Sequence, residues 1–269
     1  MRDAGIGVFD SGIGGLTVFK ALKETLPAGE RLVYLGDTAR VPYGTKSDDT
    51  VTRYAIEGAL FLERRGIKAL VIACNTMSAV ALPDLQRRLR LPVVGVIGPG
   101  AEAACLATRR QIIGVIGTAA TIKSGAYARA IATHLPQARV VGRACPLFVP
   151  LAEEGWVDND VARATAALYL RDLAAEGIDT LVLGCTHYPL LAGVIGEAVG
   201  PRVTLVDSAR ATARVVRGRL VERGLLNEGP GPPGGDDFFV TDSSDRFREV
   251  GSRFLGGPLE RLEQIDIQG

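Results

Sequence analysis

Two of the four cysteines lie in a segment that the sequence repeats. Gly66–Thr76 (GIKALVIACNT) matches Gly177–His187 (GIDTLVLGCTH), so Cys74 and Cys185 occupy equivalent positions. Each cysteine follows an apolar strand pattern and precedes small polar residues that could begin a helix. Ligands of open α/β sheets bind at the carboxyl ends of strands, and a thiol near a helix N-terminus has a lowered pKa. We expect the two thiols to flank one cleft.

Paired thiols on separate strand ends suit a two-base proton transfer. One thiolate removes a proton from a carbon atom and the other thiol returns one to the opposite face, which inverts a stereocentre. A cysteine whose pKa lies near the working pH can do this acid–base chemistry. A redox disulfide normally uses a Cys-x-x-Cys pair on one loop, which the sequence lacks. A thiol redox protein and a non-catalytic ligand-binding module are the alternatives from other functional classes.

A second repeated element begins the chain. Ile6–Ser11 resembles Ile113–Thr118, and Gly12–Gly15 (GIGG) follows the first copy. Glycine permits close backbone approach, and a helix N-terminus binds anions. The string is neither a Walker loop nor Gly-x-Gly-x-x-Gly. It is either a tight strand-to-helix turn or a binding loop in which Asp10 supplies a carboxylate at the strand end.

Three further positions carry polar groups that could assist. The loop Gly36–Gly44 follows another strand, and its backbone N–H groups could hold a carboxylate. His187 lies two residues after the second repeated cysteine and could orient or acidify that thiol. Glu153 precedes the lone tryptophan in a loop flanked by proline, where a surface carboxylate is the ordinary interpretation.

Composition excludes several classes of protein. The 269 residues include 31 basic and 30 acidic ones, a net charge of +1 that argues against a dedicated nucleic-acid binder. No apolar run approaches the roughly 20 residues needed to cross a bilayer, and no signal peptide is visible, so we expect a cytoplasmic protein without membrane contact. With two histidines and no Cys-x-x-Cys pair, we expect no metal site.

The elements that must position these residues alternate along the chain. Helical patterns separate short, mostly continuous apolar runs, which predicts parallel strands covered on both faces and an α/β fold of the doubly wound type. The repeat predicts two similar domains facing each other across a cleft. The expected strands are Gly5–Phe9, Arg31–Leu35, Ala69–Ala73, Val93–Ile97, Ile112–Ile116, Arg139–Val141, Thr180–Leu183 and Val203–Val206.

The end of the chain has a different pattern. Gly229–Gly235 (GPGPPGG) predicts a linker without regular structure, and Phe238–Thr241 predicts a strand. Phe247, Val250 and Phe254 have the spacing of an amphipathic helix. This segment is too short to be a domain, so we expect it to pack on the first one. The expected domains are 1–98 plus 208–269, and 99–207.

Four motifs together resemble those of bacterial glutamate racemases, and the resemblance covers roughly residues 5–220. They are Phe9-Asp10-Ser11-Gly12-Ile13-Gly14-Gly15-Leu16, Gly36-Asp37-Thr38 with Pro42-Tyr43-Gly44, Ala73-Cys74-Asn75-Thr76, and Gly184-Cys185-Thr186-His187-Tyr188-Pro189. The resemblance implies flavodoxin-like domains and interconversion of L- and D-glutamate without a cofactor, which supplies D-glutamate for peptidoglycan. It also implies a homodimer. A sibling racemase acting on aspartate is the alternative within the family.

The resemblance also implies roles for individual residues. Cys74 is the acid/base for D-glutamate and Cys185 for L-glutamate, with Asp10 and His187 assisting. The implied substrate-binding residues are Asp10, Ser11, Pro42, Tyr43, Gly44, Cys74, Asn75, Thr76, Thr118, Thr121, Cys185, Thr186 and His187, and the supporting carboxylates are Asp37 and Glu153. A pyridoxal cofactor needs a Schiff-base lysine, for which Lys123 is the one to check. We expect no dependence on a cell-wall precursor as activator.

Overall fold

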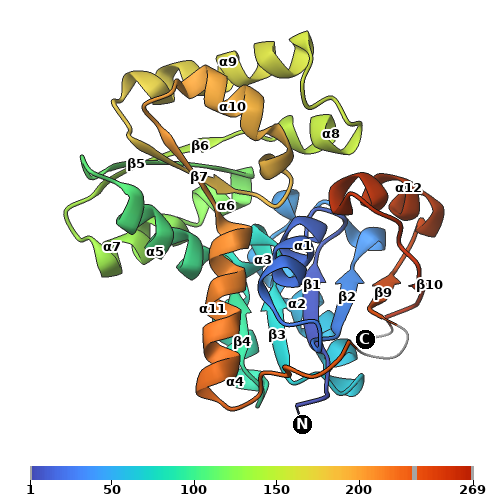
Figure 1. The fold of residues 1–269 in the computed structure, drawn as a ribbon. Helices are drawn as coiled ribbons and strands as arrows, with labels where there is room; N and C mark the ends of the chain where they lie inside the picture. Colours follow the sequence, from blue (N-terminus) through green and yellow to red (C-terminus); the bar gives the residue numbers. More distant parts are fainter. Residues whose placement is uncertain (1, 232–234, 268–269) are drawn as a thin grey trace.

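A computed structural model describes residues 2–231 and 235–267, which form two α/β domains (Figure 1). The first contains a six-stranded parallel sheet in the order β10-β9-β2-β1-β3-β4, and the second a four-stranded parallel sheet in the order β6-β5-β7-β8. The strands are β1 Ile6–Asp10, β2 Leu32–Gly36, β3 Ala69–Ile72, β4 Val93–Gly95, β5 Ile112–Gly117, β6 Arg139–Ala144, β7 Thr180–Gly184, β8 Thr204–Asp207, β9 Asp237–Val240 and β10 Leu262–Gln264.

The two sheets share one strand order. β2-β1-β3-β4 in the first sheet corresponds to β6-β5-β7-β8 in the second. The repeated segments supply the two central strands of this shared four-strand order, β1 and β3 in one sheet and β5 and β7 in the other. This confirms the prediction of two similar, doubly wound domains. In such sheets the loops after the central strands emerge side by side and form the ligand site.

Helices cover both faces of each sheet. They are α1 Leu16–Thr25, α2 Asp48–Arg64, α3 Asn75–Val80, α4 Leu82–Arg88, α5 Ile97–Ala107, α6 Ala119–Lys123, α7 Ala126–His134, α8 Phe148–Glu153, α9 Asp160–Ala175, α10 Ala192–Val199, α11 Ser208–Glu222 and α12 Ser244–Leu255. Side chains alternate across β1: Ile6 and Val8 pack with α1 and α11, whereas Phe9 packs with α2. The core cluster on the α1 side continues into the second domain.

The C-terminal segment lies on the first domain. β9 pairs with β2, and β10 pairs with β9, so the segment extends the first sheet (Figure 1). Between them, α12 buries Phe247, Val250 and Phe254 in the core, which is the face that the spacing predicts. Residues 232–234 of the expected linker lie outside the described residues.

The remaining differences from the sequence expectations are local. The strand expected over Val93–Ile97 ends at Gly95, because Ile97 begins α5. Glu153 does not lie in a loop: it is the last residue of α8, which tolerates Pro150 because this residue is in the first turn, before the first i→i−4 bond from Leu151 to Leu147. No helix within the described part of the chain has the length and apolar character required for a membrane span.

Candidate active site

The loops that follow β1, β3, β5 and β7 line one pocket between the two domains. It measures about 90 Å³, enough for several water molecules. Both Cys74, after β3, and Cys185, after β7, line it. The other lining residues are Ser11, Gly12, Ile13, Val41, Pro42, Tyr43, Gly44, Asn75, Thr76, Thr118, Val149, Glu153, Thr186 and His187.

Cys74 is a buried thiol at the first turn of α3. Its Sγ accepts a hydrogen bond from the N–H of Met77 at 3.5 Å. Burial, followed by the nearby charge of Asp10, nevertheless raises the pKa of Cys74 to about 12. The expectation of a lowered pKa is therefore wrong for this thiol, because desolvation of the thiolate outweighs the helix N-terminus.

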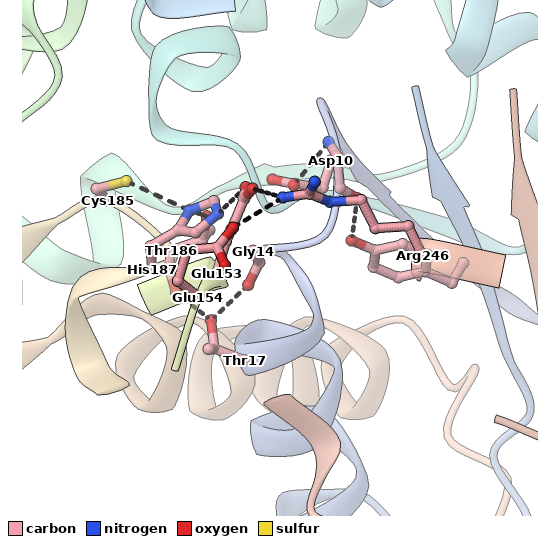
Figure 2. A network of polar contacts seen from close by, with 11 residues as sticks. Asp10, Gly14, Thr17, Glu153, Glu154, Cys185, Thr186, His187 and Arg246 are labelled. Atoms are coloured by element: carbon pink, nitrogen blue, oxygen red, sulfur yellow. Dashed lines mark hydrogen bonds and ion pairs between the residues drawn. The ribbon is translucent and has the colours of Figure 1, made fainter. Parts of the chain in front are cut away.

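Cys185 begins a chain of polar contacts across the second domain (Figure 2). Its Sγ lies 3.8 Å from Nδ1 of His187, and Nε2 of His187 donates to Oε1 of Glu153 at 3.1 Å. Burial opposes the charged form of His187, but its contacts with Cys185 and Glu153 raise its pKa to about 10. Likewise, burial opposes ionisation of Glu153, but His187 and Arg246 hold its pKa below the usual value. The imidazole is therefore held as a cation between two acidic groups.

Asp10 is the last residue of β1, is 1% exposed and does not itself line the pocket, although the next residue, Ser11, does. Its Oδ2 accepts from the N–H of Gly12 at 3.0 Å, while its Oδ1 has no hydrogen-bond partner among the described residues. Burial raises the pKa of Asp10, and the charge of His187 partly offsets this. A β-carbon on Gly15 would stand 2.4 Å from Cβ of Asp10, so the glycine string is needed for this packing. A free, buried carboxylate oxygen is suited to bind a cationic group such as an ammonium.

Asn75 contributes a second unpaired polar atom to the site. Its Oδ1 accepts from the hydroxyl of Tyr127 at 2.7 Å, and its Nδ2 has no partner in the described part of the chain. Tyr127 lies on α7 of the second domain and was not singled out from the sequence. The amide N–H₂ of Asn75 is therefore a free donor that suits a carboxylate oxygen.

Threonine hydroxyls join the two domains beside the thiols. Thr76 on α3 lies 3.0 Å from Thr118 and 3.3 Å from Thr121, oxygen to oxygen. Thr118 lines the pocket, whereas Thr121 does not, and its hydroxyl lies within hydrogen-bond distance of both Thr76 and Thr118. The role of Thr121 in substrate binding stays a prediction. Thr186 lines the pocket, and its backbone oxygen accepts from Thr17 of α1 at 2.9 Å.

Asp37 acts outside the pocket. It is fully buried and accepts hydrogen bonds from Tyr43, Arg40 and Thr241. These bonds fix the loop that carries Pro42, Tyr43 and Gly44 to the pocket wall. Glu153, the other expected supporting carboxylate, lines the pocket itself.

No group of three or more His, Cys, Asp or Glu residues able to hold a metal ion occurs within residues 2–231 and 235–267. Lys123 is exposed at the end of α6 and does not line the pocket. Arg246 of α12 pairs with Glu153, a contact that no sequence pattern indicates. Only knowledge of where α12 packs reveals this contact.

The chain is similar to known racemases over almost all its length. It is 57% identical to glutamate racemase of Geobacter metallireducens over 98% of this chain and 97% of that protein. A crystal structure of glutamate racemase isoform RacE1 from Bacillus anthracis superposes with a TM-score of 0.95 at 39% identity, covering 99% of both chains. A glutamate racemase from Francisella tularensis, solved in complex with D-glutamate, gives a TM-score of 0.92 at 39% identity, covering 99% of both chains.

The family model for Asp/Glu/Hydantoin racemases matches residues 6–216, which hold both thiols and every other lining residue of the pocket. The chain therefore belongs to the Asp/Glu/Hydantoin racemase family and is an isomerase.

Proposed function

We propose that this chain interconverts L- and D-glutamate without a cofactor, by proton transfer at Cα between two cysteines. The observation that carries the proposal is that Cys74 and Cys185, each after a central strand of a different domain, line one small pocket. Substrate Cα placed between them has one thiol on each face. The glutamate racemases of similar sequence support glutamate as the substrate.

For L-glutamate, Cys185 removes the α-proton and Cys74 delivers a proton to the opposite face. The pKa of about 12 keeps Cys74 protonated before the reaction, which is the state a donor requires. Sγ of Cys185 lies 3.8 Å from Nδ1 of the cationic His187, which orients the sulfur that takes the proton. After one turnover the protonation states are reversed, and proton exchange with water restores them. For D-glutamate the same steps run backwards.

The α-proton of an amino acid is far less acidic than a thiol, so the site must stabilise the developing negative charge. The free Oδ1 of Asp10 can bind the substrate ammonium, which keeps a positive charge next to the carbanion. The Nδ2 donor of Asn75 and the hydroxyls of Ser11, Thr76, Thr118 and Thr186 can bind the carboxylates. Fixed donors in a small pocket that excludes water are worth more than the same groups in solution.

We further propose that the enzyme works in the cytoplasm as a homodimer and supplies D-glutamate for peptidoglycan. The net charge of +1 supports a small-molecule substrate and no nucleic-acid partner. We propose domain boundaries at 1–98 plus 208–269, and 99–207. The membership of β9 and β10 in the first sheet supports this division.

The test is a racemisation assay with purified protein and no added cofactor. Optical rotation is followed from L-glutamate and from D-glutamate for the wild type and for Cys74→Ser, Cys185→Ser and Cys105→Ser. Cys105 does not line the pocket and is the matched control. We expect racemisation in the wild type and the control and its loss in both other variants. Activity on aspartate alone would contradict the choice of substrate. Full activity in Cys74→Ser or in Cys185→Ser would contradict the mechanism.

A further inference from the structure

The C-terminal helix forms ion pairs with the second domain through Arg246. Nη2 of Arg246 on α12 lies 3.7 Å from Oε2 of Glu153 and 3.4 Å from Oε1 of Glu154. Glu153 uses its other oxygen to accept from His187, which in turn faces Cys185 (Figure 2). A side chain of the first domain thus lies at the end of the chain of contacts that begins at a thiol of the second.

The surroundings of His187 show which residue of α12 can influence it. His187 is faced by Cys185 and Glu153, by the charge of Asp10 and by the ring of Phe254 on α12, whose centroid lies 5.5 Å away. The other nearby cation of α12, Arg253, pairs with Glu249 at 3.7 Å and makes no ion pair with Glu153. Arg246 is therefore the α12 cation that fixes the carboxylate behind His187.

The contacts of the other thiol are different. Sγ of Cys74 accepts from the N–H of Met77 and has Asp10 as its charged neighbour, and α12 does not take part. A change at Arg246 therefore acts through the direct contacts of Cys185 and not through those of Cys74.

We propose that Arg246 is a positioning residue for proton transfer at Cys185, because it holds Glu153 in the orientation that fixes His187. This inference rests on the proposed function. Arg246 touches neither the thiol nor the pocket, and it acts through two intermediate side chains. It also makes the C-terminal segment, which lies outside the matched family region of residues 6–216, a participant in the chemistry.

Impaired proton transfer at only one of the two thiols has a specific kinetic signature. The two enantiomers have equal free energy in water, so kcat/KM must fall by the same factor in both directions. The isotope effects need not agree. With α-deuterated L-glutamate the labelled step is removal by Cys185, whereas with α-deuterated D-glutamate it is removal by Cys74. Slower transfer at Cys185 increases the first isotope effect and decreases the second.

The experiment measures both isotope effects on kcat/KM for the wild type, Arg246→Gln, Arg246→Lys and Arg253→Gln. We expect Arg246→Gln to lower kcat/KM about fivefold, the scale of one partly exposed ion pair. Its isotope effect should rise with labelled L-glutamate and fall with labelled D-glutamate. Both isotope effects of Arg246→Lys, which keeps the charge, should lie closer to the wild-type values. The control Arg253→Gln should give the wild-type values.

Three results would overturn the proposal: equal isotope effects in Arg246→Gln and the wild type, a shift in the opposite sense, or the same shift in Arg253→Gln. A general loosening of the fold would lower kcat/KM without this asymmetry. If the wild type does not racemise glutamate, the proposed function fails separately. The same isotope effects are then measured with the amino acid that it does racemise.

Discussion

Gly14 of the first domain lies directly against Thr186 of the second. A β-carbon on Gly14 would stand 2.3 Å from Oγ1 of Thr186 and 2.5 Å from Nδ1 of His187. Contacts this short do not occur between real side chains, so the residue after Cys185 and its histidine can take their positions only because residue 14 has no side chain.

We expect Gly14→Ala to push the second domain's loop away and to reduce kcat/KM about 100-fold, since displacements near 1 Å have effects of this size. The far-UV circular dichroism should be unchanged. Gly193→Ala is the control, because a β-carbon there meets nothing within 4 Å. A Gly14→Ala enzyme with wild-type activity would show that the domains do not need this close approach.

The second prediction concerns the ionisation of His187. Its pKa is raised to about 10 in part by Glu153, so Glu153→Gln should move its titration to lower pH, because the imidazolium loses its carboxylate partner. The chain has two histidines, so NMR of protein labelled at histidine Cε1 gives two signals, with the exposed His134 as the reference.

The matched control is Glu154→Gln, since Glu154 pairs with Arg246 and not with the histidine. It should leave the titration of His187 where it is in the wild type. An unchanged titration in Glu153→Gln would mean that this carboxylate does not stabilise the charged imidazole.

The third prediction separates stability from catalysis. At the amino-terminal ends of the strands, Nζ of Lys68 lies 2.6 Å from Oε2 of Glu30, and both side chains are 2% exposed. Lys68→Met leaves a buried carboxylate without its cation, which should lower the free energy of unfolding by about 3–5 kcal/mol. Urea denaturation measures the loss, and activity of the folded fraction should persist because the pocket lies at the opposite ends of the strands.

Arg87→Met is the control for this change. Arg87 pairs with Asp84 on the surface, where removal should alter stability by less than about 1 kcal/mol. Equal losses of unfolding free energy in Lys68→Met and Arg87→Met would show that the buried Lys68–Glu30 pair stabilises the fold no more than a surface pair.

Much of the fold and of the pocket could be predicted from the sequence because the strand and loop segments that form them are repeated in it. The repeats around Cys74 and Cys185, and around Asp10 and Thr118, give the central strands of both sheets. Strand ends in a parallel sheet meet at one edge, so the residues after those strands could be placed near one another without any coordinates.

What the sequence could not give depends on packing at a distance. Proximity to a helix N-terminus predicts a lowered pKa for Cys74, but burial beside Asp10 reverses the direction. Thr121 lies one helical turn from Thr118, and only the structure shows that Thr118 lines the pocket while Thr121 does not. Arg246 contacts Glu153 and Tyr127 contacts Asn75 from helices whose positions no local pattern specifies.

The central claim is that each thiol serves one face of the substrate. The most direct test follows L-glutamate in D₂O at low conversion and measures deuterium at Cα in product and in recovered substrate. Two separate acid/bases predict deuterium in the D-glutamate that forms and none in the remaining L-glutamate, because the proton taken and the proton returned use different sulfur atoms. Deuterium appearing equally in both enantiomers, or product that keeps its original α-proton, would contradict the two-cysteine mechanism.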